Sequence, residues 1–240
     1  LVAMSLGHEC TLLIYRLLTS GWRRRCAQTL TKESRWPGAI LFYHRVADSD
    51  LANDWTISRK NFIKHLDWLS INSRIVSVAD IQASQKSACR PSPEVAITFD
   101  DGYFETTQYA IPLLLDRGLN CTYFVSTHFV ESGLPFPHDI SRGYPHAPNT
   151  IEQIRWMASR GIEIGGHTHT HANLGIGLSS TTLRREIWDA RKRLQDWSGQ
   201  AIRYFAFPYG MPENMSHDAI DMVYDAGYSG FLSAYGDWNF

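Results

Sequence analysis

Short apolar segments of β-type alternate with amphipathic helical segments along most of this chain, and this alternation is the strongest constraint on its fold. The helical segments carry apolar residues at helical spacing, and one of them opens with the capping-box pair Thr150 and Gln153. A β-then-α alternation favours a parallel sheet, either a closed barrel or an open doubly wound form. The predicted strands are 39–43, 95–99, 121–125, 161–166, 203–207 and 228–235, and the predicted helices are 58–70, 104–117, 150–159, 183–197 and 216–226.

Length and charge limit the domain count and the class of partner. The 240 residues contain no internal repeat or low-complexity linker, so we expect one domain at 37–240, preceded by a helical extension at 1–36. The net charge of -1 leaves no basic footprint for a nucleic-acid partner. The apolar run 11–18 is too short to cross a bilayer and contains Arg16, so we expect no transmembrane segment, and localisation leans towards the cytoplasm.

The polar residues most typical of a functional site follow predicted strands. Asp100 and Asp101 come directly after one strand, and a histidine-rich segment at 167–171 comes after another. The segment 208–210 follows the strand 203–207, and 237–238 follows the last one. Because the carboxyl ends of parallel strands share one face, the sequence predicts that these groups form one site.

Three histidines in this set could bind a metal, and their spacing leaves a choice. His167 and His171 are one helical turn apart, whereas His169 would join them only in an extended segment. Since the two glycines before His167 favour the end of the strand, we select His167 and His171. Together with one carboxylate they form a three-ligand site with open positions, which suits a divalent ion that activates water. If Asp101 is that carboxylate, Asp100 is free to act as a general base.

Here the sequence resembles the polysaccharide deacetylase family, which is carbohydrate esterase family 4 or the NodB-homology domain. The family motif TFDD is matched at 98–101, its motif H-[ST]-x-x-H at 167–171, and further likeness lies in PYG at 208–210 and YHRV at 43–46. The resemblance implies a distorted (β/α) barrel and metal-dependent removal of N-acetyl or O-acetyl groups from a carbohydrate. It also implies that Asp100 is the base, that Asp101, His167 and His171 hold the metal, and that the backbone N–H of Tyr209 faces the developing oxyanion. Zinc is the expected ion, with nickel, cobalt or manganese also suited to this nitrogen and oxygen set.

The sequence also departs from the family pattern. Ala206 stands where the family has an arginine that orients the base, and Ala234 stands where its aspartate partner would be. Arg203 is a nearby substitute with the wrong spacing for the same strand face. No Leu-x-His motif, the usual source of a general acid, follows before Phe240, so we expect the barrel to lack its last strand. Without that acid, O-acetyl esters should be cleaved better than N-acetyl groups, unless His44 or His138 supplies the proton.

Two further questions concern the substrate and the reaction class. The residues expected to contact an acetylated carbohydrate are Pro208, Asp237, Trp238, His44 and His138, and Trp55, Trp156 and Trp238 are the aromatic side chains nearest to polar segments. One alternative is a carbohydrate-binding member of the same fold without turnover, although such a protein needs no free base. The other is a non-haem iron oxygenase, whose two-histidine, one-carboxylate set is similar. There the carboxylate sits close to the first histidine, whereas 66 positions separate Asp101 from His167.

Overall fold

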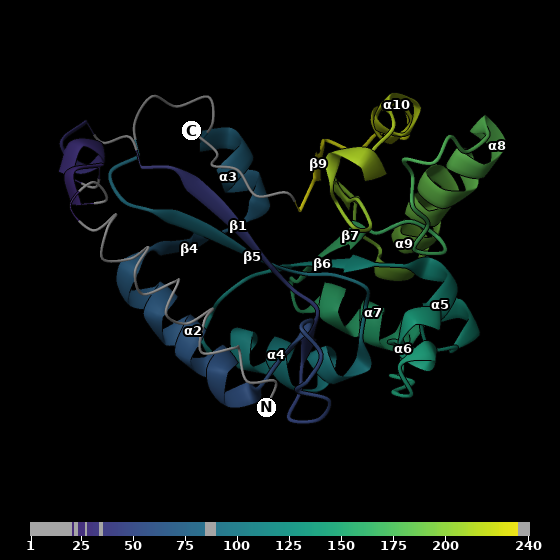
Figure 1. Ribbon diagram of the computed structural model, residues 1–240, viewed down its shortest axis with the longest axis horizontal. Helices are drawn as coiled ribbons and strands as arrows, with labels where there is room; N and C mark the ends of the chain where they lie inside the picture. Colours follow the sequence, from purple (N-terminus) through teal and green to yellow (C-terminus); the bar gives the residue numbers. More distant parts are fainter. Residues whose placement is uncertain (1–20, 22–23, 27, 34–35, 85–89, 235–240) are drawn as a thin grey trace.

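The computed structural model describes residues 21, 24–26, 28–33, 36–84 and 90–234. Its centre is a curled, wholly parallel sheet of seven strands in the order β1-β5-β6-β7-β8-β9, with β4 also paired to β5 (Figure 1). Among the described residues, β1 pairs only with β5 and β9 only with β8, so the sheet forms an open half-barrel. The strands are β1 Gly38–Tyr43, β4 Arg74–Val76, β5 Glu94–Phe99, β6 Thr122–Val125, β7 Glu163–Gly166, β8 Tyr204–Ala206 and β9 Gly230–Leu232.

Helices pack against the sheet, and a small two-stranded sheet of β2 Arg45–Val46 and β3 Thr56–Ile57 follows β1. The helices are α2 Arg59–Asn72, α3 Val78–Ser84, α4 Phe104–Asp116, α5 Thr127–Ser132, α6 Pro137–Ser141, α7 Ile151–Ser159, α8 Ser180–Leu183, the π-helix η1 Arg184–Asp189, α9 Ala190–Ser198, the 3-10 helix η2 Pro212–Asn214 and α10 His217–Asp225. None of the described helices is both long and apolar enough to cross a membrane.

The predicted caps and periodicities account for most of these elements. In α2 the side chain of Ser58 accepts the N–H of Asn61 at 3.2 Å, and the helix buries Phe62, Leu66 and Leu69 on one face. In α7 both halves of the predicted capping box are formed. Each large apolar side chain buried in this way contributes about 1.5–3 kcal/mol, so packing on the sheet is what holds these short helices. The six predicted strands and five predicted helices are all present, although the last strand is shorter than expected.

The structure differs from the sequence-based expectation in three places. The elements that were not predicted are each only 2 to 7 residues long and carry little periodicity; they are β2, β3, β4, α3, α5, α6 and η2. The single helix predicted at 183–197 contains the π-helix η1, in which Glu186 is buried. Residues 21, 24–26 and 28–33 are helical. Much of the proposed extension at 1–36 lies outside the described residues, so that division stays a prediction.

Candidate metal and catalytic site

The carboxyl ends of the central strands bring the predicted site residues to one edge of the sheet. Tyr43 at the end of β1 is in register with Phe99 at the end of β5, and the N–H of Asp100 donates to the Tyr43 carbonyl at 2.9 Å. Gly166 at the end of β7 is in register with Phe205 of β8. The residues that follow these strands are therefore neighbours, as the sequence predicted.

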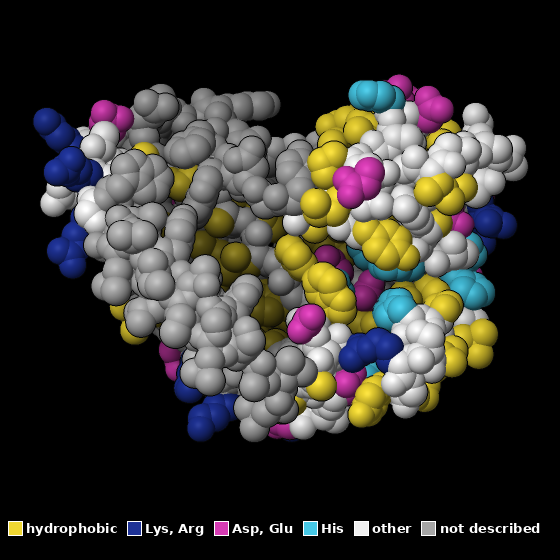
Figure 2. Space-filling view, viewed as in Figure 1, with side chains coloured by type: hydrophobic (Ala, Val, Ile, Leu, Met, Phe, Trp, Pro, Cys, Tyr) yellow, Lys and Arg dark blue, Asp and Glu magenta, His cyan; other side chains and the backbone are white. Residues whose placement is uncertain are grey.

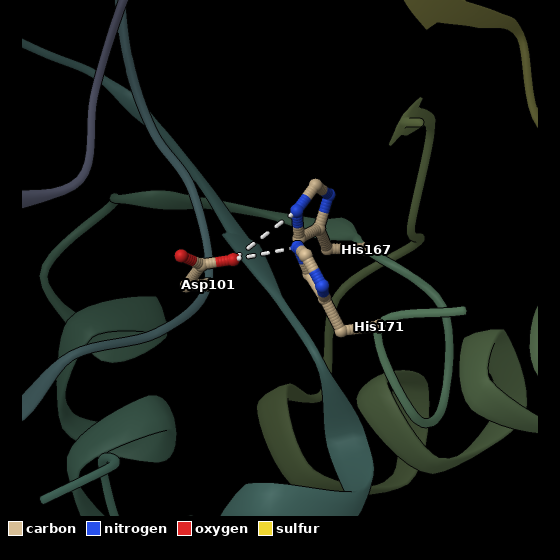
Figure 3. Close-up of side chains that lie close together, drawn as sticks. All are labelled: Asp101, His167 and His171. Carbon is tan, nitrogen blue, oxygen red and sulfur yellow. Dashed lines mark ion pairs between the residues drawn. The ribbon is translucent and has the colours of Figure 1, made fainter. Parts of the chain in front are cut away.

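Three of these side chains converge on one point (Figure 3). The Oδ1 atom of Asp101 lies 3.3 Å from Nε2 of His167 and 3.2 Å from Nε2 of His171, and all three atoms lie within 4.8 Å of one another. Although Asp101 Oδ1 is buried, no contact to it meets hydrogen-bond geometry. Ligand atoms around a tetrahedral zinc ion stand about 3.3 Å apart, given metal–nitrogen distances of about 2.0–2.1 Å. The three side chains therefore fit a divalent metal ion.

A hydrogen bond to the other ring nitrogen sets the orientation of His167. Its Nδ1 lies 2.8 Å from the backbone carbonyl oxygen of Ala206, and a carbonyl can only accept, so Nδ1 carries the proton. In the neutral ring, the Nε2 atom that faces Asp101 then has a free lone pair. Metal-binding histidines are oriented in this way by a partner on the other ring nitrogen.

The histidine segment is a loop, which corrects one part of the prediction. His167 and His171 meet at Asp101, but they are not on a helical turn, because Thr168 (φ 64°) and His171 (φ 58°) have left-handed backbone conformations that bend the chain back. His169 points elsewhere: its Nδ1 lies 2.8 Å from Oγ1 of Thr127. The selection of two imidazoles agrees with the geometry, whereas the helical reason for it was wrong.

Glu186 holds this loop and was missed by sequence reasoning. It is 1% exposed and accepts the backbone N–H groups of His169 at 3.0 Å and Thr170 at 2.7 Å, together with the hydroxyl of Thr170 at 3.0 Å. A sequence signal did exist: Glu186 lies on the same helical stripe as Leu183 and Ala190, where a charge is costly unless it has partners. A charged residue on an apolar stripe therefore pointed to a buried acceptor.

The two adjacent aspartates differ in their electrostatics. Burial raises the pKa of the Asp100 carboxyl, and it does so against the opposing effect of the nearby His167. Burial would raise the pKa of Asp101 as well, but the charge of His171 and the contact with His167 outweigh it and hold that pKa well below its usual range. Asp100 Oδ1 is buried without a hydrogen-bond partner. The two imidazoles thus favour the charged form of Asp101, whereas Asp100 is the carboxylate that is free to accept a proton.

The two histidines also differ. Burial lowers the pKa of His171, and Asp101 only partly offsets that effect. For His167 burial is outweighed by the close contact with Asp101, the charge of Asp100 and the charge of Asp101, so its pKa is raised. The ligand role requires the neutral form of both rings, so metal binding and protonation of these histidines would compete.

The other residues expected to contact substrate surround this cluster. His44 Nε2 lies 4.0 Å from Asp101 Oδ2, and the rings of His138 and Tyr209 lie 5.8 Å and 5.0 Å from that of His171. Pro208 is buried and Tyr209 is exposed, while Asp237 and Trp238 lie outside the described residues. Figure 2 shows hydrophobic side chains gathered around acidic and histidine side chains near the middle of the drawn face.

Arg203 does not take the place of the family arginine. Its guanidinium bonds Glu163 at 2.6 Å, and both residues lie at the starts of their strands, at the opposite edge of the sheet from Asp100. The reason is positional, because Arg203 precedes β8 whereas Ala206 ends it. No salt bridge to Asp100 is present among the residues that the structure describes.

Comparisons with known proteins agree with this architecture. The sequence profile described as polysaccharide deacetylase matches residues 87–231. The Bacillus subtilis protein YxkH, whose name places it among polysaccharide deacetylases, is 28% identical over 173 residues, which cover 71% of this chain and 56% of YxkH. The peptidoglycan-N-acetylglucosamine deacetylase of Bacillus cereus is 29% identical over 118 residues, which cover 49% of this chain and 36% of that enzyme. The chain thus spans about half, or less, of the length of these relatives.

Solved structures share the fold. A de-N-acetylase from Aggregatibacter actinomycetemcomitans superimposes with a TM-score of 0.68 at 21% identity, covering 84% of this chain and 89% of that one. The Streptococcus pyogenes deacetylase PplD gives 0.66 at 21% identity, covering 80% and 81%. The distorted barrel expected from the sequence is therefore confirmed as a curled parallel half-barrel. With the family profile matched over more than half of its length, the chain belongs to the polysaccharide deacetylase family.

Proposed function

We propose that this chain hydrolyses acetyl groups on a polysaccharide or oligosaccharide and that it needs one divalent metal ion to do so. The observation that carries the proposal is the convergence of Asp101 Oδ1 and two imidazole Nε2 atoms beside the unpartnered oxygen of Asp100. A non-catalytic binding protein would have no use for a buried, unpaired carboxylate of this kind. Family membership supports the acetylated carbohydrate as substrate.

In this proposal Asp101, His167 and His171 hold the ion, which is zinc or, with the same ligands, nickel, cobalt or manganese. Such an ion supplies Lewis acidity to the attacking water and to the acetyl carbonyl. Glu186 keeps the two histidines in place by fixing the loop between them. The Ala206 carbonyl keeps His167 in the tautomer that leaves Nε2 free.

Asp100 is the proposed general base. It removes a proton from water as the water oxygen bonds to the acetyl carbon, a role that requires a free carboxylate within hydrogen-bond reach. The raised pKa of Asp100, caused by burial, makes it a stronger base than an exposed aspartate once it is ionised. The backbone N–H of Tyr209, in a left-handed conformation (φ 64°), is the proposed donor to the developing oxyanion.

His44 is the proposed proton donor to the leaving group. When the bond from the acetyl carbon to the sugar nitrogen breaks, its electron pair stays on nitrogen, which needs a proton to leave as an amine. His44 comes directly after β1, and its Nε2 lies 4.0 Å from Asp101 Oδ2, so it borders the site from the strand next to β5. In this role His44 would protonate the leaving nitrogen, so N-acetyl groups are included among the proposed substrates.

The test is acetate release from a panel of acetylated glycans and from an aryl acetate, by protein loaded with zinc and by protein treated with a chelator. We expect release that is lost on chelation and restored by the metal. The variant Asp100→Asn, which keeps the size of the side chain but cannot accept the proton in the same way, is the matched control. Absence of release from every glycan by fully metal-loaded protein would refute the proposal. Turnover that requires 2-oxoglutarate would instead identify an iron oxygenase.

A further inference from the structure

An exposed aromatic surface adjoins the site on the side of His44. Trp55 is 56% exposed, and its ring centroid lies 4.7 Å from that of His44. Phe42, 40% exposed, packs edge-on against the same imidazole at 5.7 Å. Since His44 reaches to within 4.0 Å of Asp101, this surface begins where the metal-binding cluster ends. A substrate that extends from Asp101 past His44 would therefore reach Trp55.

Hydrogen bonds to both the N–H and the carbonyl of Trp55 hold its backbone in place. The N–H of Arg45 donates to the Trp55 carbonyl at 3.1 Å, and the N–H of Trp55 donates to Asn53 Oδ1 at 3.1 Å. The next residue, Thr56, donates its N–H to the Asn53 carbonyl at 2.9 Å and accepts from Nη1 of Arg45 at 3.0 Å. The indole is thus exposed on a fixed backbone.

Ionisable side chains meet at this segment, of which Arg45 and Asp50 are almost fully buried, and we call them the Arg45 network. The Arg45 side chain, 1% exposed, lies 3.2 Å from Glu105 and 3.5 Å from Asp50. His146 lies 3.2 Å from Asp50 and 3.4 Å from Glu105, and Arg142 lies 3.6 Å from Asp50. Asp50 also has a left-handed backbone (φ 52°), which is costly for a residue other than glycine. Buried ionisable groups and a strained residue in a surface segment indicate that these contacts fix the conformation of the segment.

We propose that Trp55 is a sugar-stacking residue that binds a pyranose ring neighbouring the one that carries the reacting acetyl group, and that the Arg45 network is its support. This inference rests on the proposed function. A pyranose presents an apolar C–H face and an equatorial rim of hydroxyls, so a flat, half-exposed indole can cover the face while the rim stays in water. A rigid aromatic side chain loses little conformational entropy on binding, and the fixed backbone reduces that loss further.

Trp68 provides the matched comparison. It is 62% exposed on α2, and the structure shows no aromatic ring packed on it among the described residues. It lies in the last turns of α2, which leads to the start of β4 and so to the edge of the sheet opposite to the site. A single exposed tryptophan of this kind is ordinary for a protein surface. The distinguishing features of Trp55 are its position and its support.

The experiment compares Trp55→Ala with Trp68→Ala on N-acetylglucosamine as a monosaccharide and as a tetrasaccharide. We expect Trp55→Ala to raise KM for the tetrasaccharide roughly tenfold, within the range found for loss of ring stacking on an aromatic side chain, and to affect the monosaccharide much less. Trp68→Ala should leave both unchanged, and Trp55→Phe should recover most of the affinity. An equal fall in kcat for both sugars would show that Trp55 serves only to position His44, and would overturn the inference.

Binding is measured separately, so that failure of the proposed function can be distinguished from failure of this inference. Calorimetric titration of the tetrasaccharide into Asp100→Asn protein should show weaker binding when Trp55→Ala is added and no change when Trp68→Ala is added. If the unmodified chain released no acetate, the proposed function would fail, while this titration would still test Trp55. Trp55→Leu, which keeps apolar bulk without the flat ring, replaces Ala if the Ala variant unfolds. Equal binding by all variants would disprove stacking at Trp55.

Discussion

Glu163 at one edge of the sheet and the aspartate pair at the other edge differ in how their carboxylates are partnered. At the amino-terminal edge Glu163 accepts from Arg203 at 2.6 Å and 2.9 Å and from the Thr122 hydroxyl at 2.8 Å, so the carboxylate is fully partnered. At the carboxyl-terminal edge Asp100 and Asp101 each keep a buried oxygen without a hydrogen bond. Such unpaired groups cost free energy, and the proposed metal ion and reaction would account for that cost at Asp100 and Asp101.

A cavity lies at the edge of the sheet that carries Glu163. It has a volume of about 440 Å³. Its lining includes Cys121, Glu163 and Arg203 at the starts of β6, β7 and β8, together with Val76 of β4 and Ile97 of β5. None of its lining side chains has a buried polar atom without a partner. In this molecule the shape of a hollow is therefore a weaker guide to function than the unsatisfied groups at the other edge.

Backbone strain is also concentrated near the site at the carboxyl-terminal edge of the sheet. In the part of the chain that the structure describes, the residues other than glycine with left-handed backbones are Asp50, Asp101, Thr168, His171 and Tyr209. Four of them lie at the site and the fifth lies in the segment that carries Trp55. Each costs about 1–2 kcal/mol relative to an ordinary conformation. The strain is concentrated where side chains must be aimed at a ligand, as is common at functional sites.

The largest effect should come from removing a metal ligand. Asp101→Ala, His167→Ala or His171→Ala should abolish stoichiometric zinc, measured by elemental analysis of the purified protein, and with it acetate release. The matched control is His169→Ala, which should keep the metal because that ring faces Thr127. If His169 proved essential and His171 dispensable, the assignment of the loop would be wrong.

Removing the base should separate metal binding from turnover. Asp100→Asn should keep the metal and lower kcat by roughly a hundred- to ten-thousandfold, the range for a lost general base. The expected cause is the missing proton acceptor, since the ligands of the ion are untouched. Metal content and acetate release are measured on the same preparation. Activity within a few fold of the original protein would exclude Asp100 as the base.

The proton donor should matter for amides more than for esters. His44→Ala should lower acetate release from an N-acetylated oligosaccharide by roughly a hundredfold, because an amine leaves poorly without a proton. Release from an aryl acetate should fall far less, because an aryloxide leaves unaided. His138→Ala is the comparison on the other side of the site. A larger loss of amide cleavage in His138→Ala than in His44→Ala would transfer the role to His138.

Weakening the loop anchor should have an intermediate effect. Glu186→Gln keeps the shape of the side chain but replaces a charged acceptor of three hydrogen bonds with a neutral one. We expect zinc affinity to fall roughly ten- to a hundredfold, as is usual for groups that orient metal ligands. Competition with a chromogenic chelator measures it. Unchanged affinity would mean that the loop holds its shape without Glu186.

The smallest effect is expected at the amino-terminal edge. Arg203→Ala removes a partly exposed ion pair with Glu163, and such pairs contribute about 0.2–1 kcal/mol. Thermal unfolding should therefore shift by a few degrees at most, and metal content and acetate release should not change. A tenfold loss of acetate release would contradict the distinction between the two edges, because it would show that the edge carrying Arg203 and Glu163 affects the reaction.

Local pattern was enough to predict much of this molecule. Strand and helix periodicity, the cap at Thr150 and the glycines before His167 are properties of a few neighbouring residues, and the structure agrees with them. The placement of Asp100 and His167 at one edge followed from a general rule of parallel sheets. The short elements β4, α3, α5 and α6 escaped prediction because they are too short to show a period.

The sequence by itself determined which chemical groups this protein presents at the ends of its strands, and the tertiary structure decided which of them meet. The residues next to Glu186 in the sequence do not indicate which amides it accepts from. Likewise, the residues next to Trp55 do not show that its indole lies against His44. The approach of His44 to Asp101 likewise depends on the pairing of β1 with β5. Spacing along the chain reports on one turn or one strand, whereas a site depends on distances between segments, which only the packing of the whole sheet sets.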